Sequence, residues 1–141
     1  TEVDLDFNVN CMTDSNGVLM GASGGHSDTA AGAKLAVIVV PLIRGRLPMI
    51  RDKVQTVITP GESIDVIVTE RGVAINPKRT DLLEKLKDSN LPLYTIQELQ
   101  QMSYDLVGKP KDIEVSQEDK DIVAVVEYRD GSIIDLVRKP L

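Results

Sequence analysis

The residues with the clearest potential for chemistry lie in a glycine-rich stretch from Gly21 to Lys34. It holds four of the chain's ten glycines, its only histidine, and Ser, Thr and Asp side chains, directly before an apolar run. Glycine lets a backbone approach a ligand and turn its N–H groups outward, because no Cβ blocks the way. Such a loop can form an oxyanion hole or an anion-binding nest. The alternative is a flexible connector in which Asp28 caps a short helix over Thr29–Ala33.

The composition limits the classes of protein to which the chain can belong. Its 141 residues, with 42% hydrophobic and 27% charged side chains, predict one globular domain spanning residues 1–141. No apolar run approaches the roughly 20 residues of a membrane span, and the first residues lack the pattern of a secretory signal. A net charge of −6 argues against nucleic-acid binding. We therefore expect a cytoplasmic protein without membrane or nucleic-acid partners.

Cysteine and histidine usage argues against redox and metal chemistry. Cys11 is the only cysteine, so no disulfide can form within the chain. It is a weak candidate nucleophile, because no basic residue near it in the sequence would lower its pKa. Cys11 and His26 lie fifteen positions apart, a spacing that matches no recognised pair of metal ligands. We expect neither a metal nor a tightly bound cofactor.

Hydrophobic patterns predict several strands. Val3–Val9 alternates apolar and polar residues, as in a strand with one buried face, and Val18–Met20 follows a turn as a second strand. Leu35–Val40 is uniformly apolar, which predicts a central strand covered on both faces. Further strands are expected at Val54–Thr59 and Ile64–Thr69.

The second half predicts another strand, two helices and a hairpin. Gly72–Pro77 is the strand, and Thr80 should cap a helix with Leu82, Leu83 and Leu86 on one face. Thr95 opens the second helix with a capping-box pattern, and Gly108 should end it. Asp130 and Gly131 predict a two-residue turn between strands at Ile122–Tyr128 and Ile133–Val137. The fold class is α/β, with a mixed sheet and flanking helices.

Four segments carry a resemblance to a known family. They are the Gly-Gly-His-Ser-Asp-Thr-Ala-Ala-Gly-Ala-Lys run, Pro41–Pro48, Val57–Glu62 and Ile64–Pro77. Together they resemble the carboxy-terminal part of citrate lyase α subunits, which belong to the family I coenzyme A transferases. The resemblance covers essentially the whole chain. It implies a coenzyme A transferase-like α/β domain of which these residues form a part.

The resemblance implies a reaction and its participants. Enzymes of this family attack an acyl thioester with a glutamate, and the citrate lyase α subunit transfers the acyl carrier group from acetyl to citrate. The products are a citryl thioester and acetate. Coenzyme A, or the coenzyme A-like arm of an acyl carrier (γ) subunit, is then a substrate rather than a resident cofactor. A β subunit that cleaves the citryl thioester is the other implied partner, in an oligomer.

The family's Gly-Gly-x-x-Asp loop matches Gly24, Gly25 and Asp28. The N–H groups fixed by Gly24 and Gly25 would stabilise the oxyanion of the attacked thioester. Asp28 would brace the loop, together with Gly21 and Lys34 as its structural residues.

Substrate contacts are expected from four other side chains. His26 and Ser27 follow the glycines, and His26 either hydrogen-bonds a citrate carboxylate or is a structural loop residue. Arg44 and Arg46 either bind citrate carboxylates and carrier phosphate through their fork geometry or are solvated arginines.

No glutamate of the chain lies in a nucleophile motif, and the resemblance places that residue upstream. Glu2, Glu62 and Glu70 are interpreted as solvated surface groups. We therefore expect residues 1–141 alone to be catalytically inactive and, with sheet edges exposed, to self-associate. A noncatalytic module that binds a thioester or a partner subunit is the alternative function.

Overall fold

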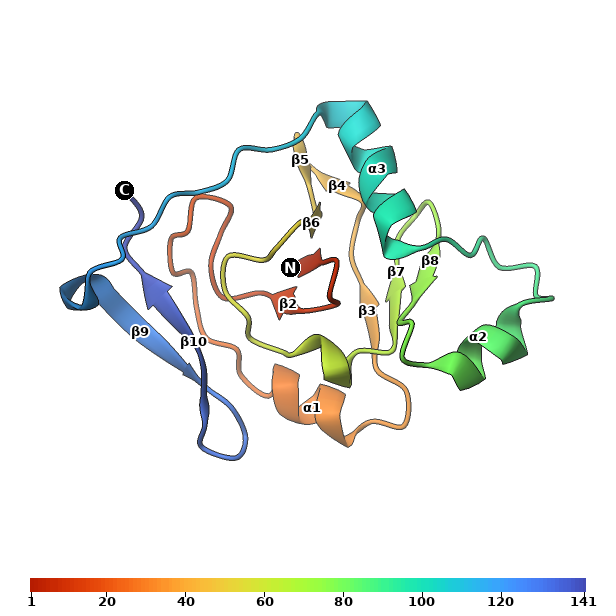
Figure 1. The fold of residues 1–141 in the computed structure, drawn as a ribbon, viewed down its shortest axis with the longest axis horizontal. Coiled ribbons are helices and arrows are strands. Elements are labelled where there is room, and N and C mark those ends of the chain that lie inside the picture. The colour runs from red at the N-terminus through yellow and green to blue at the C-terminus, as the bar shows by residue number, and fades with distance from the viewer.

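A computed structural model describes all residues 1–141. Its elements, drawn in Figure 1, are β1 (Glu2–Asp4), β2 (Val9–Asn10), α1 (His26–Gly32), β3 (Val37–Val39), β4 (Ile43–Arg44), β5 (Leu47–Pro48), β6 (Ile50–Arg51), η1 (Gly61–Ser63), β7 (Val66–Val68), β8 (Val73–Ile75), α2 (Thr80–Leu86), α3 (Ile96–Val107), η2 (Asp119–Asp121), β9 (Ile122–Glu127) and β10 (Ile133–Arg138). The α/β class is confirmed. The strands form four small sheets, in the orders β2-β1-β6, β3-β7-β8, β4-β5 and β10-β9.

The first predicted strand folds back on itself. Between β1 and β2 the chain makes a tight turn in which the N–H groups of Phe7 and Asn8 donate to the backbone carbonyl and the carboxylate of Asp4, each at 2.9 Å. Phe7 takes a φ of +65°, which is unusual for a bulky residue. The prediction of one continuous strand was wrong, because local hydrogen bonds to Asp4 favour the turn. The apolar side chains of Val3, Phe7 and Val9 are nevertheless buried.

The main core lies between the two three-stranded sheets, α1 and α3. Strand β1 pairs antiparallel with β2 and parallel with β6, while β7 pairs parallel with β3 and antiparallel with β8. Helix α3 contacts β5, β6 and β8. The buried cluster consists of Val3, Phe7, Val9, Ala30, Ala36, Val40, Leu42, Met49, Ile50, Ile64, Ile67, Ala74, Ile96 and Leu99.

Strand β3 is not the covered central strand that its apolar run predicts. It lies at the edge of its sheet, hydrogen-bonded only to β7. Ala36 and Val40 are buried, while Leu35, Val37 and Val39 face outward and are exposed. The alternation shows that within these residues only one face of the strand is covered.

Two other predicted strands do not form. Val18–Met20 is exposed and irregular, with a single bridge between Thr13 and Leu19. Val54–Thr59 is also irregular, although Thr59 bridges Val9 at the end of β2. β-branched composition alone does not provide a pairing partner, and neither segment has a neighbouring strand along its length.

Helices α2 and α3 differ in how far they are packed against the rest of the chain. In α3 the capping box of Thr95 and Glu98 forms as predicted, and Gly108 ends the helix with a φ of +81°. Helix α2 has Arg79 rather than Thr80 at its N-cap, and none of its residues is buried. Its leucine face therefore does not join the core, contrary to the pattern.

The predicted carboxy-terminal hairpin forms β9 and β10, which pack on a second small core of Met12, Ile58, Val126 and Val137. Its turn spans three residues, Arg129–Gly131, rather than two. Gly131 donates to the carbonyl of Tyr128 at 2.9 Å with a φ of +85°, and Tyr128 donates to the carbonyl of Ser132 at 2.7 Å. In Figure 1 the tip of the hairpin points toward α1.

Candidate functional site

The glycine loop turns sharply into α1, which begins earlier than predicted. Gly24 has a φ of +55°, Gly25 is the N-cap, and the helix starts at His26. Asp28 lies inside the first turn and makes no capping hydrogen bond, so its predicted capping role was wrong. The backbone N–H groups of Gly24, Gly25 and Ser27 donate no hydrogen bond within the chain. These donors are available to an acceptor from outside it.

The space around the two glycines is open. A Cβ on Gly24 would meet nothing within 4 Å, and one on Gly25 would meet only the Thr29 hydroxyl, at 3.9 Å. By contrast, a Cβ on Gly61 would lie 1.9 Å from the backbone oxygen of Asp6. A side chain at position 61 would clash with the backbone, so packing requires glycine there. A side chain at position 25 would meet no such clash, so packing does not explain Gly25.

His26 is half-buried and anchored to the neighbouring segment. Its Nδ1 lies 2.7 Å from the hydroxyl oxygen of Thr59, while Nε2 has no hydrogen-bond partner within the chain. Burial lowers the pKa of His26 below its ordinary value, and the positive charge of the chain's amino terminus acts in the same direction. The neutral imidazole is therefore favoured, with Nδ1 held by Thr59 and Nε2 free to contact a ligand.

An open recess of about 680 Å³ separates the loop from β3. Ser23, Gly25 and His26 line one side, and Leu35–Ile38 line the other. The recess joins polar loop groups to the exposed apolar edge of β3, so a bound molecule could contact both.

The remaining loop residues differ in exposure. Ser27 is buried, and its hydroxyl makes no hydrogen bond within the chain, whereas Asp28 is exposed. The Oδ1 of Asp28 lies 3.6 Å from the Nε of Arg129. Gly21 and Lys34 are exposed, and Lys34 forms no ion pair. The structure thus gives Asp28 a partner that its sequence position does not suggest.

Arg44 and Arg46 lie away from the glycine loop. They belong to the short β4-β5 hairpin, whose tip is Gly45 with a φ of +62°, and both are exposed without an ion pair. Figure 1 shows this hairpin at the opposite end of β3 from α1. The structure therefore does not bring the two arginines together with His26 and Ser27, and their role in substrate binding stays a prediction.

The three glutamates differ from one another. Glu2 is buried in β1, so its interpretation as a solvated group was wrong; its carboxylate accepts from Ser15 at 3.1 Å and Asn10 at 3.4 Å. Glu62 is exposed on η1, and the exposed Glu70 accepts from the N–H of Leu42 at 2.9 Å. None of these carboxylates lies in the glycine loop.

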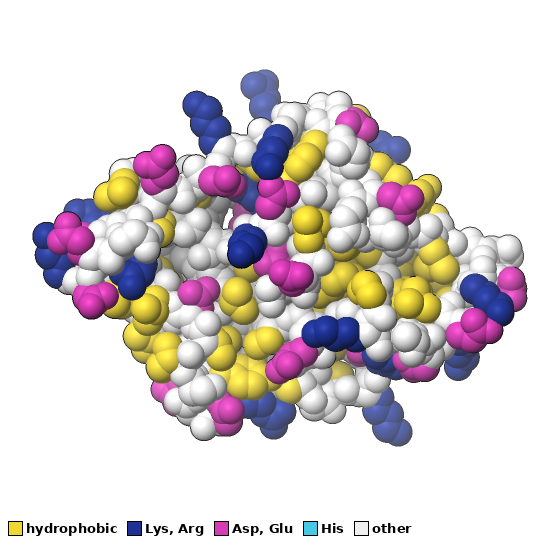
Figure 2. Space-filling model, in the orientation of Figure 1, with side chains coloured by type: hydrophobic (Ala, Val, Ile, Leu, Met, Phe, Trp, Pro, Cys, Tyr) yellow, Lys and Arg dark blue, Asp and Glu magenta, His cyan; other side chains and the backbone are white.

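Four further observations concern the cysteine, the possible metal ligands, the helices and the surface charge. Cys11 is half-buried, and burial raises its pKa, so little thiolate is present at neutral pH. No group of three His, Cys, Asp or Glu side chains is placed to hold a metal ion. No helix is both long and apolar enough to cross a membrane. Figure 2 shows basic and acidic side chains interspersed over the face in view, without a continuous basic area.

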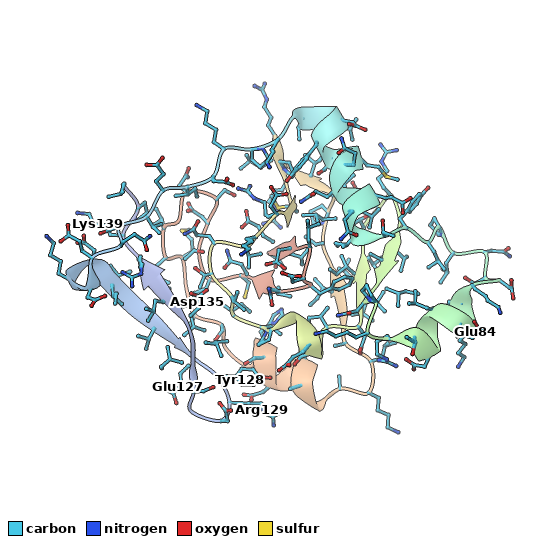
Figure 3. The ribbon with its side chains drawn as sticks, in the orientation of Figure 1. Glu84, Glu127, Tyr128, Arg129, Asp135 and Lys139 are labelled. Carbon is cyan, nitrogen blue, oxygen red and sulfur yellow. The ribbon has the colours of Figure 1, made fainter.

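The tip of the β9-β10 hairpin adjoins the loop, which sequence reasoning missed. Figure 3 shows Tyr128 and Arg129 beside α1. The hydroxyl of Tyr128 lies 3.4 Å from that of Ser63, and Arg129 reaches Asp28. Ser63 and Tyr128 are 65 positions apart in the sequence, and Asp28 and Arg129 are 101 apart, so only the docked hairpin brings them together. The turn signal at Asp130 and Gly131 predicts the hairpin, but it does not predict that the hairpin tip contacts α1.

Comparisons with known proteins agree on one family. The family model for the citrate lyase α subunit matches residues 1–140. Citrate lyase α chains from Klebsiella pneumoniae and Haemophilus influenzae are 58% and 54% identical over 98% and 96% of this chain. The chain spans 27% of the length of each.

A solved structure gives the same answer. A Streptococcus mutans protein described as the α subunit of citrate lyase, crystallised in complex with citrate, matches with a TM-score of 0.93 and 56% identity. The match covers 99% of this chain and 27% of that one. From its sequence and its fold, the chain belongs to the citrate lyase α-subunit family.

Proposed function

We propose that these residues form part of the site at which a citrate lyase α subunit exchanges acetate for citrate on a thioester carrier. The reaction is acetyl thioester plus citrate giving citryl thioester plus acetate. Coenzyme A or the coenzyme A-like arm of an acyl carrier subunit is the carrier, and a β subunit consumes the citryl thioester in the cytoplasm. The observation that carries the proposal is the pair of unpaired N–H groups at Gly24 and Gly25.

The loop would act on charge that develops during thioester attack. When a nucleophile adds to the thioester, the carbonyl oxygen becomes negative, and donors already fixed in place stabilise it. The positive φ of Gly24 holds its N–H in the turn, and the missing Cβ on Gly25 leaves room for the acyl group. The attacking carboxylate comes from elsewhere in the subunit. His26, through its free Nε2, would contact a citrate carboxylate.

The test is the Gly25→Val variant in a full-length α chain that carries these residues. The added side chain should lower kcat for citryl-coenzyme A formation from acetyl-coenzyme A and citrate by about 10²-fold. Folding should change little, because the space is open. Gly32→Val is the matched control: it lies at the other end of α1, where a Cβ also meets nothing within 4 Å, and it should keep kcat. Unchanged turnover in Gly25→Val would show that the loop only connects its neighbouring segments and has no catalytic role.

The second candidate is a noncatalytic thioester-binding or assembly module. The location of three glutamates favours it for residues 1–141 alone, because Glu2 is buried and hydrogen-bonded and neither Glu62 nor Glu70 lies in the loop. Residues 1–141 incubated with acetyl-coenzyme A and citrate should form neither citryl-coenzyme A nor a borohydride-trappable glutamyl adduct. Turnover by this segment would place the nucleophile within it.

A further inference from the structure

The tip of the β9-β10 hairpin is a turn with its own hydrogen bonds, and it contacts η1 and α1 through two side chains. The carboxylate of Asp130 accepts from the N–H and the hydroxyl of Ser132, at 2.9 and 2.6 Å. The hydroxyl of Tyr128 meets that of Ser63 on η1, and η1 contacts α1. Arg129 therefore projects from a defined turn. Figure 3 shows it at the end of α1 that follows the glycines.

Only one edge of the Arg129 guanidinium is engaged. Its Nε lies 3.6 Å from Asp28 Oδ1, and its two terminal nitrogens have no partner within the chain. Both side chains are about half exposed, and an ion pair of this length between such groups contributes little to folding. The contact nevertheless orients the guanidinium. As a helical side chain, Asp28 leans toward the amino terminus of α1, where the glycine turn lies, so its carboxylate places the Nε of Arg129 on that side.

We propose that Arg129 binds an anionic group of the substrate, with Asp28 as the residue that positions its guanidinium. The group is either a carboxylate of citrate or a phosphate of the thioester carrier, since each can accept a bidentate pair of hydrogen bonds from the two free terminal nitrogens. The chain carries a net charge of −6, so a local cation such as Arg129 would favour the approach of an anionic group. The inference rests on the proposed function and adds to it the residue that recognises substrate charge.

The experiment measures binding in a full-length α chain carrying these residues. Calorimetric titrations with citrate and with coenzyme A separate the sources, because citrate offers only carboxylates and coenzyme A only phosphates. Arg129→Gln should raise Kd by tenfold or more for citrate, coenzyme A or both, and Arg129→Lys should recover part of the loss. Lys139→Gln removes the same charge at the far end of the hairpin (Figure 3) and should stay within twofold of wild type.

A further variant distinguishes anion binding by Arg129 from the positioning of its guanidinium by Asp28. Asp28→Asn breaks the ion pair but keeps the guanidinium, so it should weaken binding much less than Arg129→Gln. In turnover assays Arg129→Gln should raise KM and largely keep kcat. The proposal is overturned if Arg129→Gln leaves both Kd values within twofold, or if Asp28→Asn reproduces its full effect. If the wild type transfers acyl groups while Arg129→Gln binds normally, only the role of Arg129 fails. If the wild type neither binds nor transfers, the proposed function fails and this role with it.

Discussion

Strands β3 and β7 carry the same three residues, Val-Ile-Val, and pair with each other residue for residue, yet only β7 is buried. Ile67 in β7 is fully buried and Val66 is 8% exposed, whereas Val37 and Val39 in β3 are 44% and 76% exposed. Strand β7 has neighbours on both edges, while β3 has one. An apolar run therefore identifies a surface suited to burial, and the neighbours decide whether it is buried.

The sharpest test of this comparison is truncation of one side chain in each strand. Ile67→Ala removes a fully buried side chain and should lower the free energy of unfolding by about 2–5 kcal/mol. Val39→Ala removes methyl groups that already face solvent and should stay within about 0.5 kcal/mol of wild type. Urea denaturation of residues 1–141 measures both. Equal losses would mean that β3 is covered in solution.

The exposed side of β3 should make residues 1–141 associate. An unpaired strand edge beside exposed Leu35, Val37 and Val39 offers backbone hydrogen bonds and apolar contact to another chain. We expect assemblies larger than a monomer in sedimentation at micromolar concentration, and a monomer for the double variant Val37→Lys with Val39→Lys. Lys139→Gln, on the distant hairpin, should associate like wild type. A wild-type monomer would show that these residues close their own core.

The same contrast explains what the sequence could predict. Local chemistry was read correctly where it decides the structure: the capping box at Thr95, the end of α3 at Gly108, and the β9-β10 hairpin. Prediction from the sequence failed where the structure depends on residues that are distant in the chain. The alternation of apolar and polar residues from Val3 to Val9 gave no indication of the turn that hydrogen bonds to Asp4 stabilise. The apolar run at β3 gave no indication that the outer face of this strand is exposed.

The candidate site shows the same division. The glycine loop and its residues could be found from composition and spacing, because positive φ and close approach require glycine. The link from Asp28 to Arg129 could not, because it depends on where a hairpin a hundred residues away docks. The burial of Glu2 was missed for a related reason: its partners Asn10 and Ser15 reach it only after the chain has turned back.

The smallest expected effect concerns His26, which lines the recess beside β3. Burial lowers its pKa below the ordinary value of 6.5, so the folded chain takes up this proton at lower pH than the unfolded chain does. The free energy of unfolding should therefore fall as the pH drops below 6.5, until the folded pKa is passed, and be constant with respect to this group above about pH 7. A His26→Gln variant should lose this component of the pH dependence.

The pKa of His26 also reports whether β3 is covered. Since it is the chain's only histidine, its imidazole signals can be followed by NMR without assignment by mutation. The recess is open in the single chain, and association over β3 would remove water from it and lower the pKa further. We expect a value below 6.5 in both forms, and a lower one in the associated wild type than in the monomeric Val37→Lys, Val39→Lys variant. The two added lysines themselves favour the neutral imidazole, so their charge works against the expected difference, and high salt should enlarge it by screening them. Equal values at high salt would mean that association occurs elsewhere on the surface, and that the open side of β3 stays in contact with water.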